Sequence, residues 1–145
     1  MNNSVNKPTT AFWIICAIAL LWNTLGANAY LQQAYKTEAF KSQYNAEQLA
    51  IIDSSPIWVT VAFAMGIFGG VIGSLGLLFR KKWANIVFKI SLAAILVQMG
   101  YSFFMINSFE LFGTFEGIIM PLIIILFATF LVWHSNKCEE KGWLS

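Results

Sequence analysis

The sequence predicts an all-α integral membrane protein, a four-helix bundle with both termini in the cytoplasm. Of its 145 residues, 58% are hydrophobic and 11% are charged, whereas soluble domains carry about 25% charged residues. Four segments are apolar over roughly the 20 residues that a helix needs to cross a bilayer. Basic residues gather in alternate connections between these segments, and such a bias sets the orientation of membrane proteins.

The predicted spans cover residues 11–31, 56–79, 84–106 and 117–134, within a single membrane domain of residues 1–145. Pro56 and Pro121 fall in or near first turns, where the missing N–H of proline costs little. Seven of the nine basic residues lie on the side of the two tails and the 80–83 link, if Lys89 is counted there. That side is therefore expected to be cytoplasmic, with the long side chain of Lys89 reaching back to the headgroups.

A short amphipathic helix is expected in the first outer loop, over residues 37–53. Phe40, Tyr44, Leu49 and Ile52 recur there at near-helical spacing among charged and amide residues. Such a helix either packs its apolar side chains against the ends of the spans or forms a lid over a ligand site. The pattern favours the first role.

The first span also has features of a signal peptide. Ala27, Asn28 and Ala29 have the small-x-small form of a cleavage site, and Lys7 supplies a weakly basic leader end. Retention of the segment is favoured because it gives an even number of spans and places both tails on the basic side. Cleavage after Ala29 is the alternative.

Residues that carry catalysis or bind metals are scarce. The single histidine, His134, has no partner at metal-ligand spacing, so a surface position is expected. Cys16 and Cys138 do not indicate a disulfide framework. No catalytic residue, metal site or cofactor is predicted, and the chain is not expected to be an enzyme. A net charge of +2 without a basic stripe gives no support for a nucleic-acid partner.

Glycines line one face of the second span. The predicted helix-packing residues are Gly66, Gly69, Gly70 and Gly73. Faces of this kind let helix backbones approach closely. The pattern predicts packing within one bundle or across a homo-oligomer through the second span.

Polar residues inside the first and third spans form the candidate site. Asn23 and Gln98 are each about eight residues from the predicted outer ends of their spans, which places both about 12 Å deep at 1.5 Å per residue. They are therefore expected to be able to meet. The candidate substrate-binding residues are Trp22, Asn23, Asn28, Tyr30, Gln98 and Tyr101. Amide groups and aromatic faces suit a polyol or another neutral solute. The alternative is hydrogen bonding between helices that fixes their register.

Three stretches resemble a known group of proteins. They are PTTAFWIICAIALLWNTLGANAYLQQAYKTEAF in the first span, LFRKKWANIVFKISLAAILVQMGY at the junction of the second and third, and the ending EKGWLS. The chain resembles small bacterial four-span membrane proteins often automatically labelled "sugar transporter". More loosely, a basic turn followed by Trp-Ala is similar to DoxX-like membrane proteins. The resemblance implies transport, and it supplies no binding or catalytic residues.

The sequence thus predicts a multi-pass protein of the bacterial inner membrane that binds or transports a small neutral solute such as a sugar. The alternative is an accessory or structural subunit of a larger membrane complex. The expected partners are the lipid bilayer, a second copy through the second span, or such a complex.

Overall fold

The computed structural model describes residues 7–145, and this part of the chain is helical without strands. The long helices are α1 (Thr10–Tyr35), α4 (Ile57–Leu78), α5 (Trp83–Tyr101) and α7 (Met120–Glu140). The short ones are α2 (Glu38–Lys41), α3 (Ala46–Asp53) and α6 (Ser108–Thr114), with π-helical turns at η2 (Ser102–Ile106) and η3 (Phe115–Ile119). Four helical segments are long and apolar enough to cross a membrane. The predicted fold class of a four-helix membrane bundle is confirmed.

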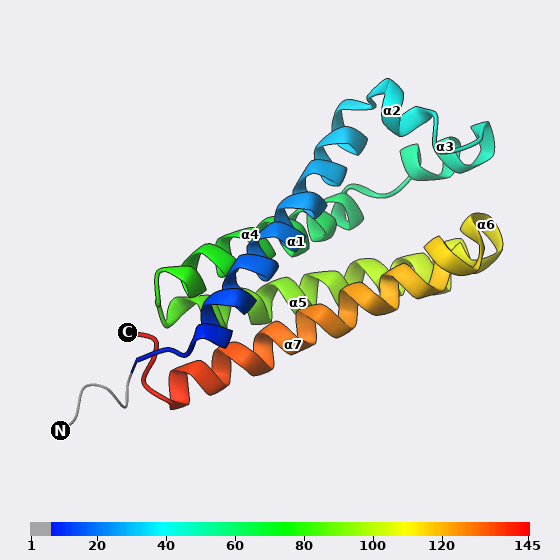
Figure 1. The fold of residues 1–145 in the computed structure, drawn as a ribbon. Helices are drawn as coiled ribbons and strands as arrows, with labels where there is room; N and C mark the ends of the chain where they lie inside the picture. Colours follow the sequence, from blue (N-terminus) through cyan, green and yellow to red (C-terminus); the bar gives the residue numbers. More distant parts are fainter. Residues whose placement is uncertain (1–6) are drawn as a thin grey trace.

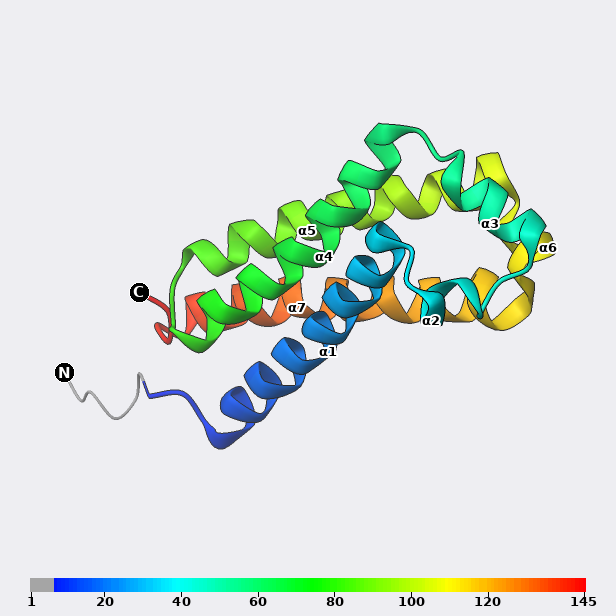
Figure 2. The same ribbon diagram turned by 90° about the horizontal axis from the view of Figure 1, so that it is seen from above.

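The bundle is built around the α4–α5 hairpin. Helix α1 packs on α4 and α7 packs on α5, whereas α1 and α7 share few close contacts. Figures 1 and 2 show α1 crossing α4 at an angle. The start of α1, the α4–α5 turn and the C-terminus lie at one end, here called the terminal end. Helices α2, α3 and α6 lie at the other, here called the loop end.

Two of the long helices extend beyond their predicted ends. Helix α1 continues to Tyr35 and stops where Lys36 takes the left-handed conformation, with φ 51°. Helix α7 continues to Glu140. Hydropathy falls after His134, but Ser135 and Cys138 stay buried on the inner side of α7. Packing therefore maintains the helix where the apolar composition ends.

The glycines of α4 pack within the chain. A Cβ atom at Gly66 would lie 2.8 Å from Cγ1 of Ile95, and one at Gly73 would lie 2.8 Å from the ring of Phe88. A Cβ at Gly69 would lie 3.1 Å from Cβ of Ser91. Close approach of α4 and α5 depends on these missing side chains. Since α5 and α1 already cover the glycine face, an oligomer through it would have to displace them.

The connection between α1 and α4 is helical as predicted, but two short helices, α2 and α3, stand where a single helix was predicted over residues 37–53. Thr37 caps α2, because its side chain accepts a hydrogen bond from the Phe40 N–H. Asn45 then starts α3 in a capping box with Gln48. Asn45 has an extended backbone, with φ −81° and ψ 174°, which interrupts the helix.

The loop between α1 and α4 docks on α6. The Gln48 side chain donates to the Leu111 carbonyl at 2.8 Å. The Tyr44 and Phe112 rings meet edge to face, with centroids 5.8 Å apart. We call α2, α3 and α6 together the cap. These two contacts join the α1–α4 connection to α6 at the loop end of the bundle.

The C-terminal tail closes the terminal end. Trp143 and Leu144 are buried in the main apolar core, together with Phe12 of α1 and Leu131 of α7. The Arg80 Nε–H donates to the Trp143 carbonyl at 2.7 Å, and the Ser145 N–H donates to the Arg80 carbonyl at 2.8 Å. We call residues 143–145 and the core beneath them the terminal plug. This segment lies beyond the fourth predicted span, which ended at residue 134.

The expectation that His134 lies on the surface is also wrong. His134 is 8% exposed and stacks on Phe130, with ring centroids 5.7 Å apart. Its Nε2 lies 3.5 Å from Sγ of Cys138, which is 1% exposed. Both side chains face inward from α7 toward the terminal plug, because they share one helix face at a spacing of four residues.

Candidate functional site

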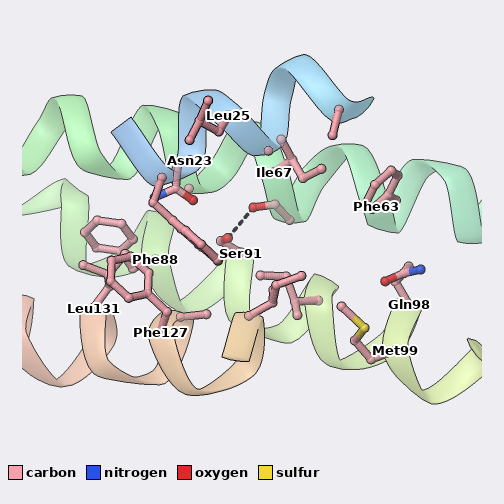
Figure 3. Close-up of a pocket in the computed structure, with 18 of the residues that line it drawn as sticks. Asn23, Leu25, Phe63, Ile67, Phe88, Ser91, Gln98, Met99, Phe127 and Leu131 are labelled. Carbon is pink, nitrogen blue, oxygen red and sulfur yellow. Dashed lines mark hydrogen bonds between the residues drawn. The ribbon is translucent and has the colours of Figure 1, made fainter. Parts of the chain in front are cut away.

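A cavity of about 300 Å³ lies between the four long helices (Figure 3). We call it the inner cavity. Its wall is mainly aliphatic and aromatic: Trp22, Leu25, Phe63, Ile67, Phe88, Ile95, Met99, Met120, Ile124, Phe127 and Leu131. Asn23, Ser91 and Gln98 add polar groups. Ligand sites in proteins commonly combine an apolar wall with a few placed polar groups, and this volume is near the lower end of their range, roughly 300 Å³.

Asn23 fastens α1 to α4 at the wall of this cavity. Its Nδ2 donates to the Ala19 carbonyl at 2.8 Å and to Oγ of Ser74 at 3.1 Å. The Ser74 hydroxyl in turn donates to the Gly70 carbonyl at 2.7 Å. Gly70 is required here because a Cβ atom would overlap Oδ1 of Asn23 and lie 2.7 Å from its Cγ. The two bonds occupy the amide N–H groups, so Oδ1 is the atom that Asn23 can offer to a ligand.

The other polar groups of the inner cavity also have internal partners. The Ser91 hydroxyl donates to the Gly66 carbonyl at 2.5 Å, which ties α5 to α4 (Figure 3). The Gln98 side chain donates to Oγ of Ser102 at 3.3 Å, within its own helical segment. Little hydrogen-bonding capacity is therefore left for a ligand in the deeper part of the cavity.

Asn23 and Gln98 line the same cavity but lie well apart along it (Figure 3). Each bonds elsewhere, Asn23 to α4 and Gln98 to Ser102. The expected meeting at equal depth was wrong because α1 ends at Tyr35 rather than at residue 31. The four additional residues place Asn23 about 6 Å deeper than expected, at 1.5 Å per residue.

A second cavity of about 440 Å³ lies above the first, under the cap. We call it the vestibule. The two cavities share part of their walls, namely Phe63, Gln98, Met99, Met120 and Ile124. The vestibule is more polar, with Gln33, Tyr44, Ser55, Thr60, Tyr101, Ser102 and Glu116 in its wall. The two cavities are therefore neighbours, one with more polar groups at the loop end and one that is mainly apolar deep in the bundle.

Four of the six candidate site residues line these two cavities. Trp22, Asn23 and Gln98 line the inner cavity, and Gln98 and Tyr101 line the vestibule. Tyr30 instead packs on α4, with its ring centroid 5.4 Å from those of Phe63 and Phe68. Asn28 is exposed on the outside of α1. The cavity-facing side of α1 carries residues 22, 26 and 29, and Asn28 lies about 100° away from Ala29.

Two parts of the site were not predicted from the sequence. Ser91 and Gln98 are seven residues apart and so share one face of α5, which is a signal that could have identified Ser91. The vestibule residues Tyr44 and Glu116 come from segments far apart in the sequence. Docking of the cap brings them together, and no local pattern predicts that contact.

Among residues 7–145, no group of three His, Cys, Asp or Glu side chains is placed to hold a metal ion. A comparison of the chain with models of protein families, with curated proteins and with solved structures finds no match in any of the three. The likeness to small four-span proteins labelled "sugar transporter" thus stays a prediction.

Tyr44 gives the cap a dependence on high pH. Burial, and then the negative charge of Glu116, raise the pKa of the Tyr44 phenol above its usual value of about 10. A raised pKa in the folded state means that the neutral phenol stabilises the docked cap fully below about pH 10. This contribution is lost as the pH rises through the higher pKa of the folded state.

We expect the phenol absorbance assigned to Tyr44, taken as wild type minus Tyr44→Phe, to titrate above pH 10. Glu116→Gln should lower that midpoint, because it removes the repulsion between two negative charges. A Tyr44 midpoint at or below the usual value for tyrosine, or one that Glu116→Gln leaves unmoved, would contradict the packing of the cap against Glu116.

Proposed function

We propose that the protein binds a small neutral amphiphile within a membrane. The apolar part of the ligand would lie in the inner cavity and its polar group in the vestibule. The observation that supports this most is the shared wall of the two cavities, with a mainly apolar cavity on one side of Gln98 and a cavity richer in polar groups on the other. A ligand with both characters would match both chambers.

The charge of the lining favours a neutral ligand. Among the described residues, the walls of both cavities contain one carboxylate, that of Glu116, and no lysine, arginine or histidine. An anionic group would have no opposite charge to replace its hydration. This composition supports hydroxyl, ester or amide groups as the polar part of the ligand.

The degree of hydrogen bonding inside the cavity favours an amphiphile over a free sugar. The Asn23 amide N–H groups and the Ser91 hydroxyl already donate to partners within the bundle. A sugar placed there would lose water from several hydroxyls without replacement, at about 1–3 kcal/mol for each unsatisfied group. A small neutral solute such as a sugar would instead fit the vestibule alone, whose wall carries more polar groups.

The direction of access follows from the packing of the two ends. The terminal plug fills the terminal end with buried side chains, including Phe12, Leu131 and Trp143. We infer that a ligand reaches the site from the loop end. Since seven of the nine basic residues lie toward the terminal end, that end would face the cytoplasm of a bacterial inner membrane.

A binding titration tests the proposal with the full chain in lipid nanodiscs. The probe is monohexanoylglycerol, a short neutral amphiphile, and the readout is tryptophan fluorescence, to which Trp22 in the cavity wall contributes. Ala128→Phe adds a ring to the inner cavity and should weaken binding at least tenfold. Ala93→Phe makes the same change on an exposed part of α5 outside both cavities and should bind like wild type. Equal binding by all three proteins, or by none, would contradict the proposal.

A second candidate function, an accessory subunit or oligomer, has support of its own from α1. Thr24 and Asn28 are exposed on a helix that is apolar enough to span a membrane. Polar side chains within spans usually find partners on neighbouring helices. Purification in mild detergent separates the two cases: a stoichiometric partner or a second copy that Asn28→Leu releases favours the subunit function, and a monomer unaffected by Asn28→Leu contradicts it.

A further inference from the structure

We infer that the inner cavity also opens sideways, between α1 and α7, into the hydrocarbon of the bilayer. Leu25 and Ala29 of α1 both line the cavity, yet Leu25 is 59% exposed and Ala29 is also exposed. Residues that face a cavity and the outside at once mark its mouth. Met120 and Ile124 of α7 line the same cavity and are half-buried. We call the space between these four residues the side opening.

Aromatic contacts bound the side opening toward the terminal end. The rings of Trp22 on α1 and Phe127 on α7 lie 5.5 Å apart and both line the cavity. Farther toward the terminal end, Phe12 lies 6.2 Å from the His134 ring. Toward the loop end, α1 crosses away from α7 (Figures 1 and 2). The two helices are thus held together on one side of the opening and separate on the other.

The cap bounds the opening toward the loop end. Its contacts between Gln48 and the Leu111 carbonyl and between Tyr44 and Phe112 join the α1–α4 connection to α6. With the cap docked, a ligand can still reach the inner cavity through the side opening, without passing the loop end. The inner cavity therefore has one approach through the vestibule and another through its side.

The depth of the side opening places it in lipid rather than in water. Leu25 lies ten residues before Tyr35, the last residue of α1, which is about 15 Å along the helix axis. A hydrocarbon core is about 30 Å thick, so a span of 26 residues places Leu25 well inside it. The four residues around the opening are apolar and suit contact with lipid chains.

This geometry narrows the class of ligand, on the basis of the proposed function. A neutral amphiphile with a single long chain can place its polar group in the vestibule and the start of its chain in the inner cavity. The rest of the chain would leave through the side opening into the bilayer. Phospholipids with anionic headgroups do not fit, because no basic residue of the described chain lines the vestibule. The ligand would then be taken from the membrane itself.

The test compares two probes of the same headgroup in nanodiscs, monohexanoylglycerol and monopalmitoylglycerol. The hexanoyl chain can be enclosed by the inner cavity, whereas the palmitoyl chain needs an exit. Ala29→Trp places a large side chain at the side opening. The control is Ala17→Trp, which makes the same change at an exposed position of α1 outside both cavities.

Wild type and Ala17→Trp should bind both probes. Because Ala29 also lines the inner cavity, Ala29→Trp should weaken binding of both probes, and it should weaken binding of the long probe at least tenfold more than binding of the short one. The inference is overturned if wild type binds the short probe and rejects the long one, or if Ala29→Trp changes the affinity for both probes by the same factor. Binding of neither probe by wild type would instead overturn the proposed function, and the side opening as a ligand route with it.

Discussion

Gly70→Leu is expected to separate α1 from α4 and to be among the most destabilising single changes in the chain. A Cβ atom at this position already overlaps the Asn23 amide, and the larger side chain would also displace the Asn23–Ser74 hydrogen bond. Forcing extra atoms into a packed interior typically costs about 1–3 kcal/mol, and loss of the hydrogen bond adds about 1 kcal/mol. We expect a loss of about 3 kcal/mol in the free energy of unfolding in detergent.

Gly100→Leu is the matched control for this experiment. Gly100 lies in α5, and a Cβ atom built there meets nothing within 4 Å. The substitution should leave stability within about 1 kcal/mol of wild type, since it removes a glycine from a helix interior. Equal effects of the two substitutions would show that α1 does not depend on the space above Gly70.

Trp143→Ala is expected to open the terminal end. Trp143 is 8% exposed and packs edge to face on Phe12, with ring centroids 5.8 Å apart. Truncation of a buried tryptophan typically costs about 3–5 kcal/mol. Cys16 and Cys138 are buried in the core beneath it, so their labelling by a water-soluble maleimide reports on the plug. We expect labelling to accelerate at least tenfold.

Trp133→Ala controls for the loss of a tryptophan near the same end. Trp133 is 55% exposed on α7, so its removal should leave the two thiols as protected as in wild type. Unchanged labelling in Trp143→Ala would mean that the C-terminal tail does not seal the bundle. The direction of access proposed for the ligand would then lose its support.

The four spans could be predicted from the sequence because each depends on the length of an apolar segment. Each predicted span overlaps a long helix, because a bilayer demands about 20 apolar residues in helical form. Polar segments were less predictable. The 37–53 segment divides at Asn45, whose backbone conformation and capping box depend on a few local atoms. Helix α7 continues past His134 because tertiary packing, rather than composition, determines where it ends.

Part of the candidate site could also be predicted from the sequence. Periodicity identified polar residues inside the spans, and Asn23 and Gln98 do line one cavity. Their relative depth required the true end of α1 and its crossing of α4. The pairing of Asn23 with Ser74 across Gly70 links two patterns, the polar face of α1 and the glycine face of α4, that the sequence presents separately.

Native mass spectrometry of the chain released from nanodiscs tests the central claim most directly. The claim is that one neutral amphiphile occupies the joined cavities, so wild type and Ala93→Phe incubated with monohexanoylglycerol should each retain one molecule per chain. Ala128→Phe, with the inner cavity filled, should retain none. The claim would be contradicted if wild type retains no monohexanoylglycerol, or if Ala128→Phe retains as much of it as wild type does.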